Sequence, residues 1–198
     1  MLLYLDEFAF ERQPSLAVAY EARGPVAPLA RLSYRSNTTC RGLGALNALT
    51  GQVHYCQRSH ITTGVLADFY THLAAAYPDA ATIYVVQDNW PVHVHPNLLA
   101  RLQPQCSPFQ PRVPDNWPGE PGPKVKRDQL PVQLVFLPTY APWLNPIEKL
   151  WHLVRQRILH LHRFSDAWEQ LKQRVLDFMA GLARPSSDLL RYVGLLPH

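Results

Sequence analysis

One short apolar run limits the architecture of this chain more than any other part of its sequence. The run covers residues 83–87 and reads Ile-Tyr-Val-Val-Gln. A nearly continuous apolar run of this length is typical of a central strand that is buried on both faces. A strand of this kind needs helices on both faces of its sheet. The run therefore predicts an α/β fold.

The order of the other elements indicates a mixed sheet. Three strands are expected first, at residues 2–6, 44–49 and 53–56, with a tight turn at Thr50-Gly51 between the last two. A helix capped by Thr62 or Thr63, the central strand, a short helix at 96–102 and a strand at 132–137 follow. Two further helices are expected, capped by Asn145 and Ser165. The first should carry one buried stripe, formed by Ile147, Leu150, Trp151, Val154, Ile158 and Leu161. Three antiparallel strands followed by alternating helices and strands predict a mixed sheet with helices on both faces.

Three acidic residues lie where such a fold would bring them together. Asp6 ends the first strand, Asp88 directly follows the central strand, and Glu148 lies in the first turn of the helix that Asn145 opens. Ligand sites gather at the carboxyl ends of parallel strands. Carboxylates are ligands for Mg²⁺, and a pair of such ions supports phosphoryl transfer. A simpler interpretation of Glu148 is a capping box with Asn145, in which the glutamate only satisfies a backbone N–H.

Two other acids compete for these roles. Alternation along the first strand turns Glu7 to the face opposite Asp6, so we favour Asp6. The tetrapeptide Asp88-Asn89-Trp90-Pro91 recurs as Asp115-Asn116-Trp117-Pro118. Asp115 lies in a proline-rich stretch that cannot supply a central strand, so we favour Asp88.

The sequence around these acids resembles a known family. The stretch Tyr-Ala-Pro-Trp-Leu-Asn-Pro-Ile-Glu-Lys-Leu-Trp at residues 140–151 is similar to the third-carboxylate motif of DDE transposases, in the bacterial insertion-sequence branch of the mariner-like superfamily. Asp88-Asn89 with His93 resembles the second motif of that family, and Asp6-Glu7-Phe8 resembles the first. In that family a spacing between the second and third acids shorter than that from Asp88 to Glu148 is usual, and Asp115 would suit it better.

This resemblance implies a ribonuclease-H-like fold and an activity. The expected catalytic and metal-binding residues are Asp6, Asp88 and Glu148. The implied cofactor is a pair of Mg²⁺ ions, for which Mn²⁺ can substitute. The implied reaction is cleavage of transposon-end DNA and transfer of its 3′ end to target DNA, carried out by a homodimer on the DNA. Two alternatives remain, namely another nuclease of the same fold and an inactive DNA-binding remnant.

The longer spacing predicts an insertion at about residues 103–131, rich in proline and expected to lack regular secondary structure. It is either a solvated surface loop or a DNA-contacting loop in which Trp117 stacks on a base. His93 is expected either to position a phosphate or to cap the local turn. The candidate DNA-contacting residues are Asn89, His93, Lys124, Lys126, Arg127, Lys149, His152 and Arg155.

Composition agrees with these expectations. The 198 residues suit one domain, and the net charge of +4 is compatible with a polyanionic partner. The three cysteines have no paired spacing, and neither a signal peptide nor an apolar membrane span is recognisable, so we expect a cytoplasmic protein with reduced thiols. The first predicted strand begins at residue 2, which leaves no room before it for a helix-turn-helix module. Three interpretations stay open: the catalytic half of a split transposase with a separate helix-turn-helix chain, a piece of a longer protein, or a remnant. In each case we expect the chain's own recognition of specific DNA ends to be weak.

Overall fold

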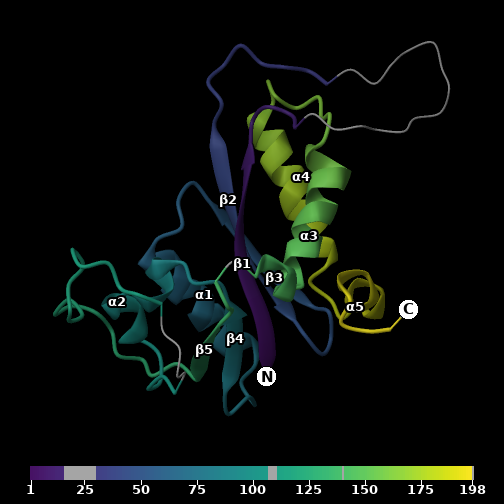
Figure 1. Ribbon diagram of the computed structural model, residues 1–198. Coiled ribbons are helices and arrows are strands. Elements are labelled where there is room, and N and C mark those ends of the chain that lie inside the picture. Colours follow the sequence, from purple (N-terminus) through teal and green to yellow (C-terminus); the bar gives the residue numbers. More distant parts are fainter. Residues whose placement is uncertain (16–29, 107–110, 140, 198) are drawn as a thin grey trace, which may run out of the picture.

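A five-stranded mixed sheet forms the centre of the computed structural model, which describes residues 1–15, 30–106, 111–139 and 141–197 (Figure 1). The strands follow the order β3-β2-β1-β4-β5 across the sheet. β1 pairs antiparallel with β2 and β2 antiparallel with β3, whereas β1 and β4, and β4 and β5, are parallel. The strands are β1 (Leu2–Glu11), β2 (Thr39–Asn47), β3 (Val53–Arg58), β4 (Ile83–Gln87) and β5 (Val132–Phe136). The predicted mixed sheet is confirmed.

Helices cover both faces of this sheet, and each face has its own hydrophobic core. One face carries α1 (Thr63–Ala76) and α2 (Pro96–Leu99). The other carries α3 (Ile147–Val154), α4 (Trp168–Gly181) and α5 (Ser187–Val193) (Figure 1). Side chains that alternate along β1 enter the two cores in turn, because successive residues of a strand point to opposite faces. Leu3 and Leu5 enter the α1 core, while Phe8 and Phe10 enter the α3 core.

The predicted helix starts are confirmed in one case and wrong in others. The Thr62 hydroxyl caps α1 by accepting from the Val65 N–H at 3.3 Å. Ser165 does not cap α4, which begins at Trp168; its hydroxyl instead donates to the carbonyl oxygen of Arg31. An additional helix, α5, follows α4 and is capped by Ser186. A short polar residue before an apolar stripe therefore marks a cap only when the surrounding fold leaves its side chain facing the helix.

The predicted stripe of α3 is confirmed for its first two turns, and Ile158 beyond them is partly buried against the same core. Ile147, Leu150, Trp151 and Val154 are buried as expected. A π-helical turn, Arg155–Leu159, then replaces the α-helix, with the His160 N–H donating to the Arg155 carbonyl at 2.8 Å. The wider turn rotates later side chains around the axis, so that Leu159 is buried in the α3 core. The predicted continuation of the stripe to Leu161 is wrong, because its φ of 49° is not helical.

The proline-rich insertion packs against the α1 and α2 side of the molecule. Its described parts, residues 103–106 and 111–131, contain no helix or strand, as predicted. Arg101 Nε donates to Asp128 Oδ2 at 2.9 Å, and the Gly122 N–H donates to Asn97 Oδ1 at 2.8 Å. Short 3₁₀ turns, Pro91–Val94 and Pro142–Leu144, follow β4 and precede α3. Among the described residues, no helix is both long enough and apolar enough to cross a lipid bilayer.

Candidate active site

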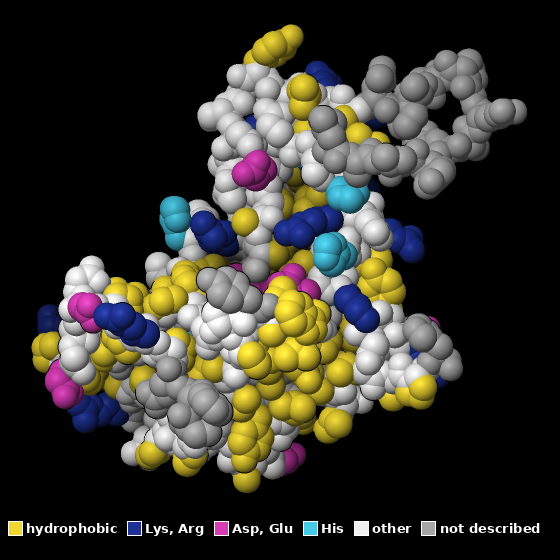
Figure 2. All heavy atoms as spheres, viewed as in Figure 1, with side chains coloured by type: hydrophobic (Ala, Val, Ile, Leu, Met, Phe, Trp, Pro, Cys, Tyr) yellow, Lys and Arg dark blue, Asp and Glu magenta, His cyan; other side chains and the backbone are white. Residues whose placement is uncertain are grey.

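The three predicted acids line one pocket of about 380 Å³, between the carboxyl end of β4 and the start of α3. Figure 2 shows acidic side chains gathered in a hollow near the middle of the molecule, with basic and histidine side chains above them. The pocket is lined by Asp6, Asp88, Asn89, Trp90, Leu137, Pro138, Thr139, Ala141, Pro142, Asn145 and Glu148. Residues separated by up to 142 positions thus share one solvent-accessible site.

Asp6 is the most buried of the three acids, with 8% of its surface exposed. The indole Nε1 of Trp151 on α3 donates to Asp6 Oδ2 at 2.9 Å. Gly44, its partner on β2, makes room for the indole, because a Cβ there would lie 2.5 Å from Trp151 Cη2. Burial, together with the charges of Glu148, Glu7 and Asp88, raises the pKa of Asp6 to about 8, although the Trp151 hydrogen bond opposes the shift. The site therefore carries negative charge that its own residues do not balance.

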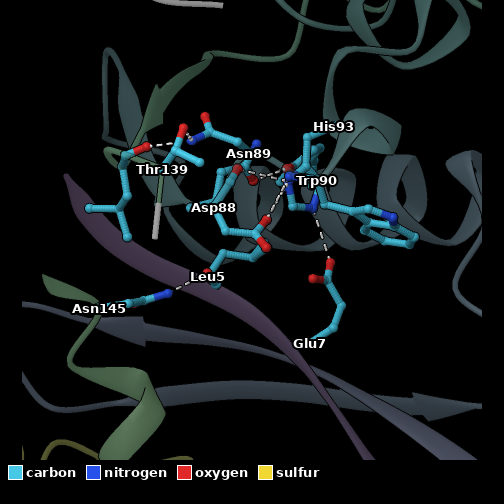
Figure 3. Close-up of polar contacts among 11 residues, drawn as sticks. Leu5, Glu7, Asp88, Asn89, Trp90, His93, Thr139 and Asn145 are labelled. Carbon is cyan, nitrogen blue, oxygen red and sulfur yellow. Dashed lines mark hydrogen bonds and ion pairs between the residues drawn. The ribbon is translucent and has the colours of Figure 1, made fainter. Parts of the chain in front are cut away.

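Asp88 is the first residue after β4, and its side chain is 56% exposed. Its Oδ1 accepts from the backbone N–H of Trp90 at 3.0 Å, which fixes the turn that leaves the strand. Asn89 Nδ2 donates to the carbonyl oxygen of Leu137 at 2.7 Å (Figure 3). Asn89 thereby ties the end of β4 to the segment that follows β5.

Glu148 lies in the first turn of α3 and is partly buried. The capping-box interpretation is wrong, because the N-cap of α3 is Pro146 and no side chain caps the helix. Asn145 Nδ2 instead donates to the carbonyl oxygen of Leu5 on β1 at 3.2 Å (Figure 3). Asn145 therefore fixes the start of α3 against β1, which places Glu148 beside the strand that carries Asp6.

Glu7 lies on the face of β1 opposite Asp6, as the alternation predicted, and it does not line the pocket. Its Oε1 lies 3.1 Å from Nε2 of His93, a histidine with no exposed surface (Figure 3). His93 Nδ1 lies 3.4 Å from Asp88 Oδ1. Burial alone would lower the pKa of His93, but the Glu7 hydrogen bond and the charges of Glu7 and Asp88 outweigh it and raise the pKa. This Glu7–His93 contact could not be predicted from the sequence, since no local pattern links residues 86 positions apart.

Asp115, the rival of Asp88, lies in an exposed turn of the insertion. Its carboxylate contacts Arg112 Nη2 at 3.1 Å, and it does not line the acidic pocket. Trp117 of the repeated tetrapeptide packs its ring against His95, with the ring centroids 4.8 Å apart. The structure therefore brings Asp88, and not Asp115, to the two other acids.

The expected DNA-contacting residues fall into three groups. Lys149 and His152 are exposed on α3, and Arg155 is half-buried at its end. Lys124, Lys126 and Arg127 are exposed in the insertion, and none of these six residues lines the acidic pocket. Asn89 lines the pocket, whereas His93 is buried beneath it.

Arg112 is a basic residue near the site that the sequence analysis did not select. It lines a second pocket that shares Asn89, Leu137, Pro138 and Thr139 with the acidic one. The side chain of Arg112 is 85% exposed. Its position in the neighbouring pocket depends on how the insertion folds back, which no local sequence signal indicates.

Comparison with known proteins places the chain in a family. Residues 1–172 match the model of the DDE superfamily endonuclease family, and the chain belongs to this family. The chain is also 25% identical over 178 residues to the insertion element IS630 uncharacterized 39 kDa protein of Shigella sonnei. That match covers 90% of this chain and 44% of the relative. The family membership that the three motifs predicted is confirmed.

Solved structures of the Mos1 mariner transposase have the same fold. The paired-end complex with Mn superposes with a TM-score of 0.62 at 16% identity, covering 99% of this chain and 52% of that one. The Mos1 strand transfer complex gives a TM-score of 0.59 at 16% identity, with 99% and 51% covered. The predicted ribonuclease-H-like architecture is thereby confirmed. The chain spans about half the length of the proteins that it matches.

Proposed function

We propose that this chain is the catalytic domain of a DNA transposase, which cuts DNA strands and joins a 3′ end to target DNA by metal-dependent phosphoryl transfer. The observation that carries the proposal is the convergence of Asp6, Asp88 and Glu148 on one pocket. Membership of the DDE superfamily endonuclease family supports it. The relatives solved with DNA ends, including a strand transfer complex, support DNA as the substrate.

The pocket fits divalent cations because its negative charge is not balanced. The repulsion that Glu148, Glu7 and Asp88 exert on Asp6 would be relieved by a cation between the carboxylates. Asp6, Asp88 and Glu148 offer the hard oxygen ligands that Mg²⁺ prefers, and the same oxygens accept Mn²⁺. Two such ions would supply activation of the attacking oxygen and stabilisation of the leaving one. A Mos1 complex has been solved with each of these two metals.

The residues of the chain itself hold this arrangement in place. Trp151 fixes one oxygen of Asp6, and the Trp90 N–H fixes one oxygen of Asp88. Asn145 holds the start of α3, with Glu148, against β1. Because the carboxylates are already held in place, they would need little rearrangement to bind an ion. Such preorganisation favours catalysis.

DNA would be held mostly through its phosphates. Lys124, Lys126, Arg127, Lys149 and Arg155 remain candidates for this role, and Arg112 joins them because it lines the pocket next to the acids. Contacts of this kind carry little sequence information and weaken steeply with salt. Dimerisation on DNA and recognition of the ends by a separate helix-turn-helix chain are part of the same proposal.

The proposal is tested with labelled DNA carrying a transposon end, in Mg²⁺ or Mn²⁺ and in EDTA. We expect nicking and 3′-end joining that EDTA abolishes. Asp88→Asn and Glu148→Gln should abolish both steps, because they keep shape but remove a ligand charge. Asp115→Asn is the matched control and should retain full activity. Cleavage that persists in EDTA or in Asp88→Asn would contradict the mechanism, and nicking without joining would indicate a nuclease of another type.

A further inference from the structure

A buried histidine links two carboxylates beneath the acidic pocket. His93 has no exposed surface, and its ring lies between Glu7 and Asp88 (Figure 3). Nε2 faces Glu7 Oε1 at 3.1 Å, while Nδ1 lies 3.4 Å from both Asp88 Oδ1 and the Asp88 carbonyl oxygen. A carbonyl oxygen only accepts hydrogen bonds, so Nδ1 is the nitrogen that donates to Asp88. The ring therefore joins Glu7 at one nitrogen to Asp88 at the other.

The link acts on one particular oxygen of Asp88. Oδ1 accepts from the Trp90 N–H at 3.0 Å and also faces His93 Nδ1. Within the described residues, no donor contacts the other oxygen, Oδ2. The Asp88 side chain is 56% exposed and would otherwise be free to change rotamer. The two contacts to Oδ1 therefore select one orientation of the carboxylate and leave Oδ2 for another ligand.

The same three residues are close enough to suggest an ion site of their own, since their potential ligand atoms lie within 4.8 Å of one another. The direction of the ring argues against this. Its two nitrogens face different carboxylates, and an ion could take only one of them. Glu7 also has only 14% of its side chain exposed and lies on the face of β1 away from the pocket. A link from Glu7 through the ring to Asp88 accounts for the polar contacts of both ring nitrogens.

We propose that Glu7 is a positioning residue that acts through His93 to hold Asp88 in the orientation that binds the divalent cation. This inference rests on the proposed function, in which Asp88 is a metal ligand. Carboxylate partners of metal-site residues commonly change metal affinity or activity by about 10- to 100-fold when they are removed. Glu7 is a carboxylate partner of this kind, although it lies outside the pocket.

Mn²⁺ binding to the protein without DNA, followed by electron paramagnetic resonance, tests the inference. Glu7→Ala should weaken Mn²⁺ affinity by about 10- to 100-fold. Excess Mn²⁺ should restore DNA cleavage in Glu7→Ala, whereas no concentration should restore it in Asp88→Asn. Glu11→Ala is the matched control, because Glu11 lies on the same strand, is exposed, and hydrogen-bonds only to Asn37 among the described residues. It should bind Mn²⁺ like the wild type.

A double-mutant cycle distinguishes a link from Glu7 through His93 from independent effects of the two residues on Mn²⁺ affinity. His93→Asn keeps an amide donor near the place of Nδ1 but is too short to reach Glu7. In the His93→Asn background, Glu7→Ala should cause no further loss of Mn²⁺ affinity, since groups that act through one another are not additive. Additive losses would overturn the link. If Glu7→Ala does not fold, Glu7→Gln replaces it, with a smaller loss in the same direction expected.

The other outcomes are equally decisive. Unchanged Mn²⁺ affinity in Glu7→Ala, with or without a lower melting temperature, would overturn the positioning role and leave the proposed function intact. One ion fewer per chain, with unchanged affinity for the rest, would show that Glu7 and His93 hold an ion themselves. A wild-type protein that binds no Mn²⁺ would overturn the proposed function, and this inference with it.

Discussion

Replacing Asp6 by asparagine should stabilise the metal-free protein near neutral pH while it removes metal binding. Asp6 has a pKa of about 8 because it is buried and repelled by Glu148, Glu7 and Asp88. Asparagine has nearly the same shape, and its side-chain oxygen can still accept from Trp151 Nε1. The substitution therefore removes the charge and keeps the one hydrogen bond that holds the residue.

The magnitude follows from the pKa. The ordinary value is 3.8 and the folded value is about 8, so the folded state holds the proton more tightly than the unfolded state. The free energy of unfolding therefore falls as the pH rises from about 4 to about 8. Each pKa unit corresponds to 1.36 kcal/mol, which gives a loss of roughly 4 kcal/mol by pH 7. Asparagine has no such loss, so its melting temperature at pH 7 should be about 8 °C or more above that of the wild type.

Thermal unfolding followed by circular dichroism between pH 4 and pH 8, in EDTA, measures this difference. The wild type should lose stability relative to Asp6→Asn as the pH rises, and the two should converge near pH 4. Asp115→Asn, at an exposed position, should follow the wild type throughout. Added Mg²⁺ should raise the melting temperature of the wild type and not that of Asp6→Asn, because binding to the folded state alone stabilises it.

Parallel curves for the wild type and Asp6→Asn across this pH range would refute the reasoning. They would show that repulsion between Asp6 and the neighbouring carboxylates does not lower the free energy of unfolding. A wild type that Mg²⁺ fails to stabilise would separately contradict the assignment of Asp6 as a metal ligand.

Three further predictions concern other parts of the molecule. Gly44→Ala should destabilise the fold by about 1–3 kcal/mol in urea unfolding, because the added methyl group meets Trp151; an unchanged midpoint would contradict that packing. Arg112→Ala should weaken binding to all DNA sequences alike and reduce the salt slope by about one in fluorescence anisotropy, and an unchanged slope would exclude a phosphate contact. Burial and the neighbouring His72 lower the pKa of His54 to about 4. The contribution of the neutral His54 to the free energy of unfolding should therefore be lost as the pH falls from about 6.5 to 4. In His54→Gln the urea midpoint should change less with pH over that window, and a pH dependence like that of the wild type would count against this account.

Local patterns in the sequence were sufficient to locate the five strands and the three acids, but not the ends of the strands, since β1 extends to Glu11 and β2 covers Thr39–Asn47. The apolar run of β4 and the alternation of Leu3, Leu5 and Asp6 depend only on which face of a strand each side chain occupies, so they could be interpreted without the fold. Asp88 and Glu148 could be selected for the same reason, since one directly follows a strand and the other lies in the first turn of a helix. Asp6 was expected to end the first strand, but β1 continues to Glu11 and Asp6 lies in its middle. Their shared pocket follows from the topology that these elements adopt.

The tertiary structure decided every contact between residues that are distant in the chain. Asn145 suggested a helix cap, but its Oδ1 has no hydrogen-bond partner among the described residues, and its Nδ2 donates to the Leu5 carbonyl 140 residues away because α3 packs on β1. Ser165 likewise donates to Arg31 instead of capping α4. Glu7 contacts His93 only because β1 pairs with β4 in the sheet, and His93 lies in the turn that follows β4. A side chain with several local options takes the partner that folding brings within reach, and that partner is not encoded in the residues beside it.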